Sequence, residues 1–163
     1  MTSPTKIPQI QAQKLFIILF IISLILSHIG IVGIEDSSIM PNYFIALIVS
    51  FILAKRARLD LFKLVIIGLI VDIFTGQLIG QYGLIFIIVY ILNFSVNKIL
   101  VIKYQKQIES LSIFLILFSF IILWLTSQSY NIFITPKILL LQSIFTFIAY
   151  LFFKVIINKY ISK

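Results

Sequence analysis

The 163-residue sequence contains no cysteine, one histidine and five acidic residues, and only 11% of its residues are charged. Without cysteine there are no disulfides, thiol nucleophiles or thiolate metal sites. The histidine, His28, has no second histidine or acidic residue at metal-ligand spacing, so we expect it to be a hydrogen-bonded structural residue. The acidic residues are Glu35, Asp36, Asp60, Asp72 and Glu109.

These scarcities argue against several enzyme classes. A serine hydrolase needs a base, and the one histidine is not close to any nucleophile elbow. Lipid phosphotransferases hold a divalent metal with several carboxylates, and Asp72 has no acidic companion in its own segment. The glycine-containing stretch 76–83 lacks the lysine and spacing of a P-loop. We predict a protein that is not an enzyme and has no metal or cofactor.

Apolar residues are abundant instead: 61% of the chain is hydrophobic, and the mean hydropathy is +1.19. A soluble fold could not cover this much hydrocarbon, so the sequence predicts an integral membrane protein. A helical crossing needs about 20 residues, so six crossings use most of the chain and leave no room for a soluble domain. The net charge of +8 then indicates loops that face an anionic membrane surface rather than nucleic acid.

The apolar runs predict an all-α, polytopic membrane protein, a single six-helix bundle covering residues 15–158. Residues 1–14 are predicted to be a flexible N-terminal tail, and residues 159–163 a short C-terminal end. Continuous apolar runs of this length are typical of helices, because a backbone in lipid must satisfy its own hydrogen bonds. The predicted spans are about 15–34, 39–54, 61–78, 84–102, 111–127 and 138–157.

The distribution of charge predicts the orientation. With a cytoplasmic N-terminus, six spans place twelve of the thirteen Lys and Arg residues inside and only Lys137 outside. Such a bias follows the positive-inside rule. We therefore expect a multi-pass membrane protein with both termini in the cytoplasm.

Asp72 is an acidic residue within an apolar segment, and it belongs to a four-residue repeat with Gly68, Gly76 and Gly80. If the helix is continuous from Lys63, Asp72 lies roughly 13 Å along it, near the middle of the bilayer. Small residues at this spacing form a packing seam for another helix. The seam either holds a partner or substrate, or it is intramolecular, with Asp72 protonated or hydrogen-bonded to a Ser, Thr or Asn.

Three further features leave alternatives open. Residues 75–83 are expected to continue the third helix, to turn back within the bilayer or to form an external turn. The cytoplasmic basic loop anchors to anionic lipid or docks a cytoplasmic protein. Trp124, Tyr82 and Tyr130 lie near predicted span ends, as membrane-interface anchors do. The residues of the basic loop are Lys55, Arg56, Arg58 and Lys63.

Pro41 stands at the start of a short second predicted span, and that span has a basic end at 55–58. A Gly-Leu-x-x-Asp core from Gly68 to Asp72 is followed by spaced glycines. Together these features resemble the MreD family of bacterial rod shape-determining membrane proteins. The resemblance implies a non-catalytic component of the cell-elongation complex in the bacterial inner membrane, which regulates cell shape and lateral peptidoglycan synthesis. The implied partners are MreC, then MreB and RodA with its penicillin-binding partner, directly or indirectly, and membrane lipids.

The alternative is a substrate-binding subunit of an energy-coupling-factor vitamin transporter, which is also a small six-span protein. Such a protein needs polar and aromatic residues that converge on an outer pocket. The candidates are Ser127, Gln128, Ser129, Tyr130 and Asn131, with Gln77, Gln81 and Tyr82.

Overall fold

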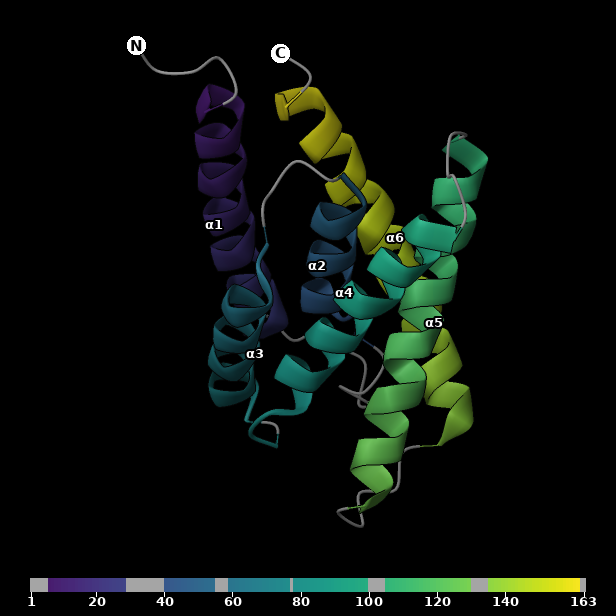
Figure 1. The fold of residues 1–163 in the computed structure, drawn as a ribbon. Coiled ribbons are helices and arrows are strands. Elements are labelled where there is room, and N and C mark those ends of the chain that lie inside the picture. The colour runs from purple at the N-terminus through teal and green to yellow at the C-terminus, as the bar shows by residue number, and fades with distance from the viewer. Residues whose placement is uncertain are drawn as a thin grey trace.

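The computed structural model describes residues 6–28, 40–54, 59–76, 78–99, 105–129 and 135–161. Within these ranges the chain is all-helical, as the sequence predicts (Figure 1). The helices are α1 (Lys6–His28), α2 (Tyr43–Ala54), α3 (Leu61–Thr75), α4 (Gln81–Ile99), α5 (Gln105–Ser129) and α6 (Pro136–Ile161).

Four of these helices are long and apolar enough to cross a membrane. They are α1, α4, α5 and α6, whose apolar stretches contain 19 to 25 residues. The other two are shorter: α2 has 12 residues and α3 has 15. At 1.5 Å per residue they are about 18 and 22 Å long, whereas the hydrocarbon core of a bilayer is about 30 Å thick.

The first helix begins earlier than the sequence predicts. It starts at Lys6, so most of the predicted tail of residues 1–14 is helical. Pro8 lies in the first turn, where its missing N–H costs no hydrogen bond. The residues that follow, from Gln9 to Lys14, are mostly straight-chain or alanine residues with good helix propensity. The polar sequence therefore extends a helix whose apolar part starts further along.

The shortest helix lies at the centre of the bundle. Nine consecutive residues of α2, from Phe44 to Ile52, are buried. The helix packs against α1, α4, α5 and α6. A helix that is apolar on every side is stable when protein surrounds it on every side. Helix α2 is therefore enclosed by its neighbouring helices.

Two pairs of helices make the most extensive contacts in the bundle. Helices α3 and α4 pack chiefly against each other as a hairpin, and α6 packs closely on α2. The first residues of α1 and the last residues of α6 lie at the same end of the bundle (Figure 1).

Buried hydroxyl groups in the helices are satisfied locally. Ser23, Ser119 and Thr146 each donate a hydrogen bond of 2.7 to 2.8 Å to the carbonyl oxygen four residues earlier. This back-bonding removes the cost of an unpaired hydroxyl in an apolar interior. These three hydroxyl groups are therefore paired within their own helices.

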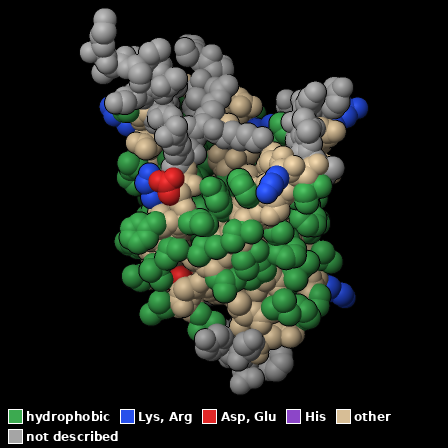
Figure 2. Space-filling model, in the orientation of Figure 1, with side chains coloured by type: hydrophobic (Ala, Val, Ile, Leu, Met, Phe, Trp, Pro, Cys, Tyr) green, Lys and Arg blue, Asp and Glu red, His purple; other side chains and the backbone are tan. Residues whose placement is uncertain are grey.

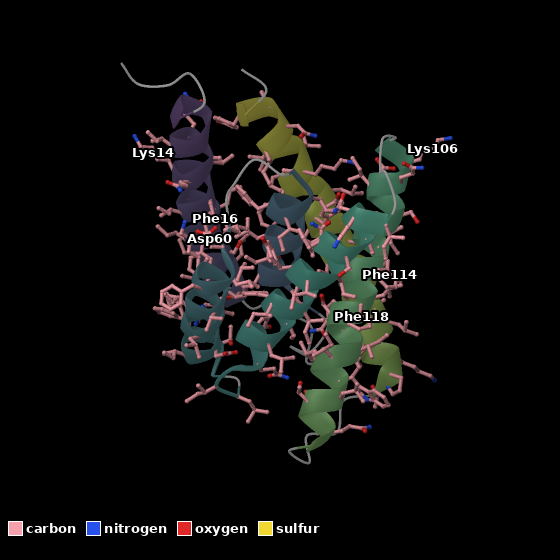
Figure 3. The ribbon with its side chains drawn as sticks, in the orientation of Figure 1. Lys14, Phe16, Asp60, Lys106, Phe114 and Phe118 are labelled. Carbon is pink, nitrogen blue, oxygen red and sulfur yellow. The ribbon has the colours of Figure 1, made fainter. Side chains whose placement is uncertain are left out.

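The outer surface is apolar over most of its height. In the face shown in Figure 2, hydrophobic side chains cover the middle, and most visible Lys and Arg side chains lie toward the upper end. Phe114, which is exposed, and Phe118, which is partly buried, stack on α5 with their ring centroids 6.0 Å apart (Figure 3). An apolar belt with charge gathered toward one end is what a membrane protein requires.

One ion pair joins two of the long helices. Lys154 on α6 donates to Glu109 on α5 at 2.9 Å, and the lysine side chain is only 18% exposed. It lies beside a cavity of about 190 Å³ at the C-terminal end of α2. A lysine this buried needs the carboxylate, because an unpaired charge in a poorly hydrated place is costly.

Candidate functional site at the α3–α4 turn

Helix α3 ends at Thr75, so residues 75–83 do not continue it as one helix. Gly76 has a left-handed conformation, with φ 64° and ψ 23°, and its N–H donates to the carbonyl oxygen of Asp72. Gly80 also has a positive φ, of 94°. Residues with a side chain rarely adopt this region, so both positions favour glycine. The chain turns between these glycines, and α4 begins at Gln81.

The Asp72 carboxylate holds this turn closed. Its Oδ2 accepts a hydrogen bond of 2.7 Å from the N–H of Gly80, and its Oδ1 accepts one of 2.9 Å from the N–H of Tyr82. These N–H groups at the start of α4 have no carbonyl partner within their own helix. A carboxylate at this position satisfies them and also favours the partial positive charge of the helix N-terminus.

Asp72 thus has partners other than those expected from the sequence. The sequence suggests a Ser, Thr or Asn side chain as its hydrogen-bond partner, whereas the structure provides backbone N–H groups. Asp72 also lies in the last turn of α3 rather than in the middle of a long helix, because the helix stops at Thr75. Its side chain is fully buried.

The four residues of the predicted seam divide into two pairs. Gly68 and Asp72 lie on α3, while Gly76 and Gly80 lie in the turn that follows it. Gly68 makes the close approach to α4: a Cβ atom added there would lie 2.3 Å from the Cα of Gly83. Since real Cβ atoms do not approach a backbone so closely, only glycine fits at this crossing.

A polar network next to the turn connects three further elements. The side-chain amide of Asn42 donates to the hydroxyl of Tyr82 at 2.6 Å, and its Oδ1 accepts from the N–H of Ile45 at 3.1 Å. The backbone N–H of Asn42 donates to the hydroxyl of Thr146 at 2.9 Å. Asn42 therefore caps α2 and ties it to α4 and α6.

Sequence reasoning missed Asn42. It placed Pro41 in the first turn of a helix, but α2 begins at Tyr43, and Asn42 is its capping residue. The signal was present, because an asparagine directly before an apolar run is a common N-cap. Its bond to Tyr82 has no local signal, since the two residues are 40 positions apart.

The network borders a cavity of about 280 Å³ at the same end of the bundle. Polar side chains from five helices and from the segment before α2 line it, and His28 is among them. The imidazole Nδ1 of His28 lies 2.8 Å from the carbonyl oxygen of Leu24, one turn earlier, as expected for a structural histidine. The polar lining residues are Ser27, His28, Asn42, Tyr43, Thr75, Tyr82 and Gln142.

The residues proposed for a vitamin pocket do not point to one place. Gln81 donates to the hydroxyl of Thr126 on α5 at 2.6 Å, whereas Tyr82 binds Asn42 beside α2. Ser127 donates to the carbonyl oxygen of Leu123 on its own helix. Gln77, Tyr130 and Asn131 lie outside the described residues.

Of the predicted basic loop, only Lys63 falls within the described residues; Lys55, Arg56 and Arg58 lie outside them. Lys63 forms an ion pair of 3.2 Å with Asp60, one turn earlier, and both side chains are well exposed. An exposed pair of this kind contributes little to stability.

The outer face of the α3–α4 turn is apolar. Ile73 and Phe74, at the end of α3, and Ile79, in the turn itself, are all exposed, and Ile79 is exposed to 81%. The turn therefore combines a buried acidic anchor with an apolar exterior, an arrangement suited to contact with lipid or with another membrane protein.

The comparison with known families agrees with the resemblance seen in the sequence. Residues 9–163, nearly the whole chain, match the family described as rod shape-determining protein MreD. No curated protein and no solved structure matches the chain. Together with the four helices able to cross a membrane, the match over almost its entire length shows that the chain is a membrane protein belonging to the MreD family of rod shape-determining proteins.

Proposed function

We propose that this protein is a non-catalytic inner-membrane component of the bacterial cell-elongation complex, regulating cell shape and lateral peptidoglycan synthesis. Membership of the MreD family is the observation that carries the proposal. In this role the protein binds MreC. Through MreC or directly, it couples to MreB filaments and to RodA with its penicillin-binding partner.

The proposal includes six membrane crossings, two of them by the short helices. The central position of α2 supports this, because a helix enclosed by protein does not need to match the thickness of the bilayer. Polar groups accompany both of its ends, with Asn42 and Tyr82 at one end and Lys154 at the other. These groups supply a polar environment where α2 stops short of the membrane surface.

The proposed orientation has both chain termini in the cytoplasm. Helices α1 and α6 begin and end, respectively, at one end of the bundle (Figure 1), and Lys14 and Lys106 lie toward that same end (Figure 3). The positive-inside rule then places this end in the cytoplasm and the α3–α4 turn on the outer side. The basic loop at 55–63 would lie against anionic lipid of the inner leaflet.

We place the contact with MreC at the α3–α4 turn. Gly68 and Asp72 are occupied by α4, so a partner cannot use them directly. Instead, they fix the turn that carries Ile73 and Ile79, whose exposed side chains offer an apolar surface beside the membrane. A rigid turn with an apolar exterior binds a partner at a lower entropic cost than a mobile one.

The test uses two variants of one glycine. Gly76→Leu places a side chain in a left-handed conformation, with nothing within 4 Å of its Cβ, so it strains the turn without a clash. Gly76→Asn is the matched control, because asparagine tolerates this conformation. We expect Gly76→Leu to insert normally but to lose co-purification with MreC, while Gly76→Asn keeps it. Equal recovery of MreC with both variants would remove the turn from the interface.

A second experiment tests the function itself. Depletion of the protein in its rod-shaped host should produce round cells, and the unaltered gene should restore rods. Normal rods with impaired vitamin uptake would instead favour the transporter subunit. A pull-down in mild detergent, with identification of the accompanying membrane proteins, tests the partners MreC, MreB and RodA together.

A further inference from the structure

An apolar groove runs along the outside of the bundle between α5 and α6. It has a volume of about 350 Å³ and is lined by Phe120 and Trp124 from α5 and by Pro136, Leu140 and Ser143 from α6, among others. Both helices are long and apolar enough to cross a membrane, so the groove opens toward lipid. A hollow in this position is filled in a bilayer, because empty space forfeits dispersion contacts.

The small residue Ser143 lines the groove and is nearly fully buried. Its hydroxyl donates to the carbonyl oxygen of Leu140 at 2.7 Å, so it adds no free polar group to the lining. Leu140 and Ile121 lie at the rim with about half or more of their surface exposed. The groove is therefore an apolar slot that a hydrocarbon chain can enter from the side.

A basic residue lies at one end of this slot. Lys137 follows Pro136 in the first turn of α6, and its side chain is exposed. It forms no ion pair with the described acidic residues, which are Asp60, Asp72 and Glu109. In the proposed orientation it is the one basic residue on the outer side, so it is not explained by the positive-inside rule.

We propose that the groove binds one acyl chain of an anionic phospholipid, whose phosphate group lies against Lys137. The charge at one end and the apolar slot alongside reproduce the layout of such a lipid. The lining runs from Pro136 to Ser143, about 10 Å along α6. A helix about 10 Å across would fill roughly 800 Å³ over that length, so the 350 Å³ groove fits a chain rather than a helix.

The protein carries its own reporter for this site. Trp124 is the single tryptophan of the chain and lines the groove. The intact protein would be reconstituted in phosphatidylcholine bilayers with equal fractions of brominated phosphatidylglycerol or brominated phosphatidylcholine, because bromine quenches tryptophan fluorescence on contact. We expect brominated phosphatidylglycerol to quench Trp124 with an apparent affinity roughly fivefold stronger than that of brominated phosphatidylcholine. One lysine near the membrane surface contributes about this much to the binding of an anionic lipid.

Two matched pairs of variants separate the headgroup from the chain. Lys137→Gln should lower the ratio of the apparent affinities for the anionic and the zwitterionic lipid to about one. Lys159→Gln, at the opposite end of α6, should leave this ratio unchanged. Leu140→Phe should fill the groove and reduce quenching by both lipids. Leu141→Phe, the exposed neighbour outside the lining, should not reduce it.

Three results would overturn the proposal. The first is equal quenching of the unaltered protein by the anionic and the zwitterionic lipid. The second is a preference that persists in Lys137→Gln, which would place the anionic headgroup elsewhere. The third is the same quenching in Leu140→Phe and Leu141→Phe, which would mean that the chain does not enter the groove.

Discussion

The carboxylate of Asp72, in the last turn of α3, accepts a hydrogen bond from the backbone N–H of Tyr82, in the first turn of α4. One side chain thereby joins the end of one helix to the beginning of the next. Because the acceptor is a carboxylate and the donors are helix N-terminal N–H groups, the bond is of the stronger, charge-assisted kind. The α3–α4 hairpin depends on this side chain as well as on its apolar contacts.

Replacing this carboxylate should destabilise the hairpin. Asp72→Asn keeps the shape but has one oxygen acceptor, so one of the N–H groups of Gly80 and Tyr82 loses its partner. We expect a loss of about 1–3 kcal/mol, and a larger loss for Asp72→Ala, measured as thermal stability in detergent. Asp60→Asn is the control, because it removes only an exposed ion pair. Equal stability of Asp72→Asn and the unaltered protein would contradict this role.

The two glycines at the helix crossing should respond in opposite ways. Gly68→Ala places a methyl group 2.3 Å from the Cα of Gly83, so the helices must separate, at a cost of about 1–3 kcal/mol. Gly83→Ala meets only the carbonyl oxygen of Val65, at 3.7 Å. That variant should be neutral, or more stable by about 0.5–1 kcal/mol, because alanine favours helix. Similar melting temperatures for both variants would show that the crossing is not as close as described.

Replacing Asn42 should destabilise the protein more than replacing its partner Tyr82. Tyr82→Phe removes the hydroxyl that accepts from Asn42, for about 1 kcal/mol. Asn42→Ala loses this bond and the cap of α2 together, for about 2 kcal/mol. Asn42→Ser, which keeps a capping oxygen but has no amide to donate to Tyr82, should resemble Tyr82→Phe. Stability measurements on the three variants test this order. An Asn42→Ala variant that is as stable as Tyr82→Phe would contradict it.

Replacing one or the other residue of the ion pair between α5 and α6 should destabilise the protein to different degrees. Lys154 is 18% exposed and Glu109 is 42% exposed, so an isolated Lys154 is less well hydrated. We expect Glu109→Gln to destabilise the protein more than Lys154→Met, whose side chain fills the same space without a charge. The difference should be about 1 kcal/mol, reduced from the fully buried case because the pair reaches solvent. Thermal unfolding of the two variants in parallel decides the order.

The helical class and the long apolar helices could be predicted from composition, since continuous apolar runs leave a membrane chain few alternatives. The central position of α2 could not be predicted from the sequence. In a soluble protein, a helix without a polar face indicates burial. In this chain nearly every helix is apolar on all sides, so the pattern from Phe44 to Ile52 does not separate a central helix from a lipid-facing one.

The sequence singles out the residues of the α3–α4 turn but does not predict how they are arranged. Asp72 and the glycines are visible in the sequence, yet a glycine every four residues fits a helix seam as well as a turn. In the structure Gly76 ends the helix in a left-handed conformation, and Asp72 accepts from N–H donors eight and ten residues later. Such donors belong to the backbone, which has no sequence signature. The same reason hides the link between Asn42 and Tyr82.

The shortness of α2 has a consequence for how the protein is made. A stretch of 12 apolar residues is too short to be handled by the insertion machinery as an independent span. It gains its stability from neighbours on all sides, including α6, which is synthesised after the other five helices. The core helix is therefore covered only once α6 has been made, and truncation before α6 would leave it without this cover and expose the nascent chain to membrane proteases.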